Sequence, residues 1–236
     1  MRKAAFSFIV LALAGIASPA AAAKPPVIVE LFTAQGCSSC IQASAHAADL
    51  ADKDGVLPLT FSVDYWDYLG WTDTFARPEF TERQKAYAKR LGLREVYTPQ
   101  VIVEGRHQVA GGQATKVDAL VKQAARAPKD PPDMLYMENG KIAVGSSRYR
   151  LPGGGEVWLV RYDPRRTEVE VKKGDNKGET VEERNVVRQL VRLGRWRGRP
   201  TAFKLPPADE EGLETLVLVQ QTGGGRIVAA LKQPSR

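Results

Sequence analysis

The sequence has few of the side chains from which proteins build metal centres or disulfide frameworks. Its 236 residues include two cysteines, two histidines and three methionines. One cysteine pair cannot make the multiply bridged framework of small secreted domains, and a chain of this length can bury a core without one. His46 falls on the far side of the helix predicted after Cys40, and His107 lies in a predicted hairpin. We therefore expect no resident metal and no cofactor, with a thiol-based copper site as an open alternative.

Long apolar segments are also missing beyond the first 23 residues. Residues 1–23 have the pattern of an export signal: Arg2 and Lys3 are followed by a short apolar stretch and by three alanines at 21–23. The apolar stretch is short for a membrane span, and a retained N-terminal anchor is the alternative. We expect a periplasmic or secreted protein with no membrane span after signal removal.

The basic surplus is confined to one half of the chain. Without the signal, 32 basic side chains stand against 27 acidic ones; residues 24–130 hold 13 of each, and residues 131–236 hold 19 and 14. A proline-rich stretch at 127–132 separates the halves and predicts a domain boundary there. The arginines around Trp196 (Arg192, Arg195, Arg197 and Arg199) are typical of an exposed rim, and export makes a nucleic-acid partner unexpected.

The stretch Val27–Cys40 carries the strongest chemical signal. A run of β-branched and apolar residues predicts a buried strand, Gly36 a turn, and the following alanine-rich residues a helix that the cysteines open. A helix N-terminus stabilises a thiolate, so we expect Cys37 to be a solvent-facing attacking thiol and Cys40 its shielded resolving partner. A structural disulfide closing so small a loop would stabilise the fold only slightly, and metal ligation is a further alternative.

The remaining pattern predicts an α/β domain over 24–130 and a smaller, mainly antiparallel β domain over 131–236. In the first half, a strand at 59–63, a helix at 79–91 and a strand after Pro99 follow the cysteines. In the second half, alternating segments flank the turn signals Asn139-Gly140 and Thr222–Gly225, and apolar spacing predicts one helix over 180–193.

An aromatic segment follows the strand at 59–63. Asp64–Trp71 contains two tyrosines and two tryptophans, and it leaves the same edge of the predicted sheet as the cysteines. Trp66 and Trp71 are therefore candidates for binding an unfolded or peptide-like substrate. The alternative is that these rings pack beneath a loop.

Four short motifs together resemble an exported bacterial thioredoxin-like family of unknown function. They are Val29–Thr33, Gly36–Cys40, Val63–Asp67 and Tyr97–Gln100. The resemblance implies a thioredoxin-like α/β fold over residues 24–130. It also implies thiol–disulfide oxidoreductase chemistry on a protein or peptide thiol, with an unidentified redox partner that recycles the site.

The resemblance also implies roles for individual residues. Cys37 and Cys40 would be the catalytic pair, Pro99 the cis-proline, and Thr98 a main-chain contact for an extended substrate. Glu30, an acid within a buried strand, would relay protons, with a structural salt bridge as the alternative. A non-catalytic binding module and a copper-binding thioredoxin-like carrier remain alternative functions. The sequence does not determine whether the pair oxidises, reduces or isomerises.

Overall fold

The computed structural model describes residues 25–147 and 151–234, and the predicted signal at 1–23 lies outside them. The helices are α1 (Cys40–Leu50), α2 (Pro78–Leu91), α3 (Ala114–Arg126) and a single 3-10 turn, η1 (Asp67–Leu69). The strands are β1 (Val27–Thr33), β2 (Val56–Ser62), β3 (Gln100–Val103), β4 (His107–Ala110), β5 (Met134–Met137), β6 (Lys141–Val144), β7 (Gly155–Asp163), β8 (Thr167–Glu170), β9 (Thr180–Glu183), β10 (Val186–Trp196), β11 (Thr201–Lys204), β12 (Glu214–Gln221) and β13 (Ile227–Lys232).

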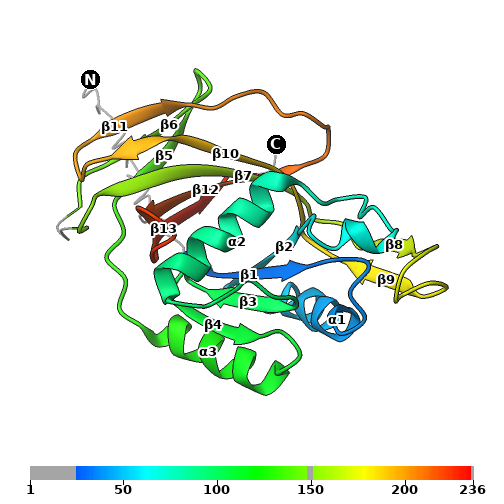
Figure 1. Cartoon of the computed structure of the whole chain (residues 1–236). Helices are drawn as coiled ribbons and strands as arrows, with labels where there is room; N and C mark the ends of the chain where they lie inside the picture. The colour runs from blue at the N-terminus through cyan, green and yellow to red at the C-terminus, as the bar shows by residue number, and fades with distance from the viewer. Residues whose placement is uncertain (1–24, 148–150, 235–236) are drawn as a thin grey trace, which may run out of the picture.

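One mixed sheet of eight strands runs through both halves of the chain, in the order β13-β12-β7-β10-β2-β1-β3-β4 (Figure 1). β2 is parallel to β1 on one side and to β10 on the other, where Val186 pairs with Thr60. The other neighbours are antiparallel. Because strands of the second half continue the sheet of the first, the predicted fold is wrong. The described chain is mostly β, not an α/β thioredoxin-like domain followed by a separate small β domain.

The predicted helix over 180–193 is also wrong, because this stretch forms β9 and the first part of β10. The ladder between β10 and β7 shifts register between Val187 and Gln189 and again between Arg192 and Gly194. Each irregularity inserts a residue into the strand and breaks its period of two. The apolar residues at 186, 187, 190 and 191 consequently show the spacing of a helix while they belong to a bulged strand.

Alternation along β1 distributes its side chains to opposite faces of the sheet. Ile28 and Phe32 join a core beneath α2, whereas Val29 and Leu31 join a second core beneath α1 and α3. A third core lies between strands β7, β12 and β13 and a separate three-stranded sheet, β11-β6-β5. Trp196 is buried in this third core, and the arginines around it are exposed, as expected for a rim.

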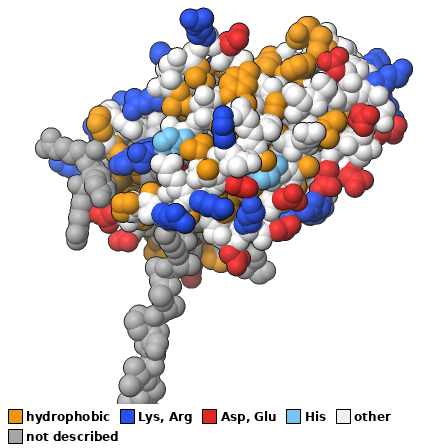
Figure 2. Space-filling view, turned by 90° about the horizontal axis from the view of Figure 1, so that it is seen from below, with side chains coloured by type: hydrophobic (Ala, Val, Ile, Leu, Met, Phe, Trp, Pro, Cys, Tyr) orange, Lys and Arg blue, Asp and Glu red, His pale blue; other side chains and the backbone are white. Residues whose placement is uncertain are grey.

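The second half supplies two further structures. β5 and β6 form the hairpin predicted at Asn139-Gly140, and β12 and β13 form the hairpin predicted at Thr222–Gly225. β8 pairs with β9 to make a two-stranded hairpin that extends beside α1 (Figure 1). On the face seen in Figure 2, basic and acidic side chains are intermixed rather than gathered into a region of one sign.

Candidate redox site

Cys37 and Cys40 form a disulfide in the loop that joins β1 to α1, with their Cα atoms 5.3 Å apart. The Cys37 amide donates to the carbonyl of Ala34 at 3.1 Å, and the Cys40 amide donates to the carbonyl of Cys37 at 3.0 Å. α1 begins at Cys40, so both sulfurs lie at its N-terminal end. The local geometry thus brings together the pair predicted from the sequence.

The predicted exposure of Cys37 is wrong. Its exposed fraction is 0%, that of Cys40 is 1%, and the intervening Ser38 and Ser39 are exposed. A helix N-terminus considered alone leaves its first residues open to solvent. Here other segments fold over the loop, so the disulfide is buried while Ser38 and Ser39 remain exposed.

Thr98 and Pro99 lie beside the disulfide. The Thr98 hydroxyl donates to the Cys37 sulfur at 3.3 Å, and the Ser39 hydroxyl lies 3.5 Å from the same sulfur. The Thr98–Pro99 peptide bond is cis. Gly111 permits the close packing here, because a Cβ at that position would lie 2.9 Å from the Pro99 Cβ. The structure therefore places two hydroxyl groups on the sulfur predicted to attack.

Glu30 belongs to a buried ion pair. Its carboxylate accepts a hydrogen bond from Arg83 Nε at 2.6 Å and a second from the Tyr87 hydroxyl. The two charged side chains are 0% and 4% exposed. The Arg83 guanidinium also donates to Gln220 of β12, so the pair connects β1, α2 and the second half of the chain. Glu30 thus forms the structural salt bridge that was the alternative to a proton relay. Both hydrogen-bond partners of its carboxylate, Arg83 and Tyr87, belong to α2.

The aromatic segment belongs to residues 64–76, which lie over the cysteine loop and are called the cover below. Trp66 and Trp71 are half-buried, and the Trp71 indole nitrogen donates to the side chain of Gln35 at 3.1 Å. Tyr68, by contrast, is 82% exposed. Burial raises the pKa of Tyr65 to about 12, and its hydroxyl faces Gln84 and Thr98. The rings therefore combine packing with a small exposed apolar tip.

Gln35, two residues before Cys37, joins the cysteine loop to two distant segments. Its amide donates to Asp73 at 2.7 Å, and its side-chain nitrogen donates to Thr74 at 2.9 Å. The same nitrogen lies 3.4 Å from a carboxylate oxygen of Glu183, at the end of β9. Asn176 donates to the Gln35 carbonyl at 2.7 Å. All these contacts are made by a residue that is 0% exposed.

Asp73 and Glu183 are the functional candidates that the sequence did not indicate. Both carboxyl groups are buried, and desolvation is the largest cause that raises the pKa of each; the Asp67 charge further raises the pKa of Asp73, and the Asp73 charge further raises the pKa of Glu183. The pKa of Glu183 rises from 4.5 to about 8. Reading residues 180–183 as a strand would have placed Val181 and Glu183 on the same inward face. The prediction of a helix over 180–193 hid this signal.

Within the described parts of the chain, 25–147 and 151–234, no three His, Cys, Asp or Glu side chains are grouped to hold a metal ion. Of the helices described there, none is both long and apolar enough to cross a membrane.

These features define a mostly β protein whose large mixed sheet carries a buried Cys-x-x-Cys disulfide at a helix start. Residues 28–220 match the family model described as "Protein of unknown function (DUF1223)", and the chain belongs to that family. The resemblance to a family of unknown function is thus confirmed, while the comparisons do not establish membership of the thioredoxin superfamily.

Two solved structures are similar to the chain. The first is a protein from Agrobacterium tumefaciens determined by a structural genomics consortium: it is 32% identical, with 90% of this chain and 99% of that chain covered and a TM-score of 0.69. The second, HBP35 of Porphyromonas gingivalis, is 14% identical, with 89% of this chain and 75% of that chain covered and a TM-score of 0.60. The second likeness concerns the fold alone. No curated protein matches the sequence.

Proposed function

We propose that this protein is an exported thiol–disulfide oxidoreductase in which Cys37 and Cys40 exchange electrons with protein or peptide thiols. The observation that carries the proposal is the environment of the Cys37 sulfur. Two hydroxyl groups, from Thr98 and Ser39, lie within 3.5 Å of it, and α1 begins three residues later. Hydrogen bonds and a helix N-terminus both favour a thiolate over a thiol, which is the property that exchange chemistry needs.

The reaction balances as two successive exchanges. A substrate thiolate attacks the Cys37 sulfur, a bond forms between them, and the Cys37–Cys40 bond breaks to release the Cys40 thiolate. A second substrate thiolate then attacks the substrate sulfur of this mixed disulfide and releases the Cys37 thiolate. The substrate leaves as a disulfide, and the protein has gained two electrons. In the reverse direction the protein dithiol reduces a substrate disulfide. A second thiol–disulfide protein of suitable potential restores the starting state.

Burial of the sulfurs sets a condition on this chemistry. Attack on a disulfide requires an approach to one sulfur along the bond, and both sulfurs are covered. Exchange with a protein therefore requires the cover formed by residues 64–76 to move. The same burial favours a second function, a binding module in which the disulfide only braces the loop after β1.

The Cys40→Ala variant separates the two functions. In the oxidoreductase, it holds a substrate on Cys37 as a mixed disulfide that reductant releases, whereas the matched Cys37→Ala variant holds none. Equal trapping by the two variants, or trapping by neither, would favour the binding module. The comparison is made in cells that export the protein, because export supplies the physiological thiols.

The Thr98→Val variant tests the sulfur environment directly. It keeps the side-chain shape and removes the hydroxyl that donates to Cys37. A hydrogen bond to a charged group contributes about 1.5 kcal/mol or more. Its loss destabilises the thiolate, so the reduction potential should fall by about 30 mV. Equilibration with glutathione buffers measures the change, and an unchanged potential would show that the Thr98 hydroxyl does not stabilise the thiolate.

A further inference from the structure

We propose that Gln35 and the carboxyl pair Asp73–Glu183 form a latch, which keeps the disulfide covered while the pair holds a proton and uncovers it when that proton is lost. The latch concerns access to the Cys37–Cys40 bond. It goes beyond the proposed function, because it would operate on the disulfide even if the cysteines had no physiological redox partner.

The latch joins three segments that are remote in sequence. Gln35 belongs to the cysteine loop, Asp73 and Thr74 to the cover, and Glu183 to the β8–β9 hairpin. The Gln35 side chain donates toward Thr74 and Glu183, and its carbonyl oxygen accepts from the amide of Thr74 at 3.2 Å. Trp71 donates to the same oxygen. One buried amide side chain thus fixes the cover to the loop that carries Cys37.

The two carboxyl groups both contact Gln35, Asp73 through the backbone N–H and Glu183 through the side-chain amide. Asp73 accepts from the backbone of Gln35 at 2.7 Å and of Phe75 at 2.9 Å, which are bonds that suit a carboxylate. Glu183 has one oxygen near the Gln35 side chain, and its other oxygen is buried without a partner in the described residues. A buried oxygen without a donor is tolerated in a neutral carboxyl group and is costly in an ion. The geometry assigns the proton to Glu183.

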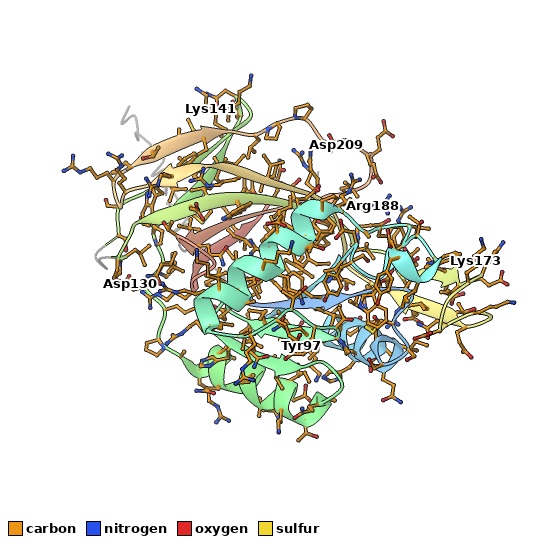
Figure 3. The ribbon with its side chains drawn as sticks, viewed as in Figure 1. Tyr97, Asp130, Lys141, Lys173, Arg188 and Asp209 are labelled. Carbon is orange, nitrogen blue, oxygen red and sulfur yellow. A yellow bond between two sulfur atoms is a disulfide. The ribbon has the colours of Figure 1, made fainter. Side chains whose placement is uncertain are left out.

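The surrounding charges leave the pair under-compensated. Asp67, from the cover, lies close enough to add a further negative charge, since its carboxylate accepts from the Asp73 amide at 3.1 Å. The positive charge of Arg188, in β10, lowers the pKa of Glu183. Its guanidinium, however, also bonds Glu210 and lies 4.6 Å from the Phe75 ring centroid. Figure 3 labels Arg188 near the start of β10.

Salt bridges engage several charged side chains of the hairpin and its surroundings. Arg166 bonds Glu182, and both Arg166 and Arg184 bond Asp52, which follows α1. Lys173, labelled in Figure 3, lies toward the outer end of the hairpin. When Glu183 ionises, its carboxylate and that of Asp73 lie in one buried site around Gln35. The repulsion between the two carboxylates then opposes the closed position of the cover. Separation of the cover from the loop relieves it.

The test is the rate at which a phosphine reductant cleaves the disulfide of the folded protein. The phosphine takes up oxygen from water as the two thiols form, so no thiol exchange is involved. Rates from pH 6 to pH 9 are divided by those for oxidised glutathione, which removes the pH dependence of the reagent. Circular dichroism at each pH shows that the protein remains folded. If loss of one proton opens the latch, the corrected rate should rise by up to about tenfold per pH unit around the transition.

Variants assign the effect. Glu183→Gln keeps the shape and cannot ionise, so its disulfide should be reduced slowly at every pH. Glu182→Gln, at the neighbouring exposed residue, is the matched control and should behave like the wild type. Gln35→Ala removes the side-chain amide that links the cover to the cysteine loop, so its disulfide should be reduced rapidly at every pH. If Glu183→Gln does not fold, this variant and Asp73→Asn still test the latch.

A wild-type rate that does not change with pH would overturn the proposal. So would a Glu183→Gln profile that matches the wild type, or slow reduction of Gln35→Ala. These outcomes are independent of mixed-disulfide trapping by Cys40→Ala. Failure of the latch therefore leaves the proposed oxidoreductase function standing, and failure of that function leaves the latch standing.

Discussion

Replacement of Arg83 by methionine should destabilise the protein severely. Arg83 pairs with Glu30 at 2.6 Å, and its side chain is 4% exposed. Its guanidinium carbon also lies 5.3 to 5.7 Å from the ring centroids of Phe61, Tyr87 and Trp158. Methionine fills much of the same volume among these rings but leaves the Glu30 carboxylate buried without its cation.

The size of the loss follows from this unpaired charge. Breaking one partner of a buried ion pair costs about 3–5 kcal/mol. Since a native domain has a total stability of about 5–15 kcal/mol, Arg83→Met should remove a large share of it. The double variant Glu30→Gln, Arg83→Met has no buried charge left at this position. It should therefore regain most of the loss, because a neutral side chain costs far less to bury than an ion.

Urea unfolding at pH 7 measures both effects. The midpoint of Arg83→Met should fall while the slope with urea stays unchanged, and the double variant should lie close to the wild type. Lys85→Met is the matched control on the same helix: its pair with Glu82 is exposed, so the urea midpoint of this variant should stay close to that of the wild type. The reasoning would be refuted by a loss below 1 kcal/mol for Arg83→Met, or by a double variant as unstable as the single one.

Three further predictions concern the fold and its pH dependence. Residues 24–130 expressed alone should not give a cooperative unfolding transition, because α2 and β2 bury their side chains against strands of the second half; a sharp calorimetric transition for this fragment would contradict this. Gly224→Ala should cost about 2 kcal/mol or more, because its φ is +71° and the added Cβ would lie 2.8 Å from the backbone of Ala86, whereas Gly223→Ala, with φ +73° and open space, should cost only about 1 kcal/mol; equal urea midpoints would refute the contact. The raised pKa of Glu183 means that the folded state retains a proton that the unfolded state releases, so stability should fall between pH 4.5 and about 8. Urea midpoints across that range should show Glu183→Gln gaining on the wild type as pH rises, and a constant difference would count against it.

Local patterns in the sequence were sufficient where an element is determined by its own residues. β1, the Cys37–Cys40 pair, α2 and the hairpins at Asn139-Gly140 and Thr222–Gly225 follow from apolar runs, helix starts and turn chemistry. β10 could not be predicted in this way, because its bulges imitate the spacing of a helix. Its place beside β2 depends on pairing between residues far apart in the chain.

The same distinction between local patterns and distant contacts applies to the candidate site. The neighbourhood of Thr98 and Cys37 was anticipated through short motifs, whereas burial of the disulfide was not. The buried loop is contacted through Gln35 by Asp73 and Glu183, which come from two other parts of the chain. Similarly, the sequence marked Glu30 as a buried acid but could not identify Arg83 as its partner, since that choice depends on how α2 crosses the sheet.

The position of β10 also affects the order of folding. Thr60 and its ladder partner Val186 are separated by more than half of the chain, so the outer side of β2 keeps open hydrogen-bonding groups until β10 reaches it. Such an edge can recruit strands from other, still incompletely folded chains. Contacts between residues so distant in sequence also form slowly. The protein therefore has a vulnerable interval during its biogenesis, which ends only when the late strand arrives.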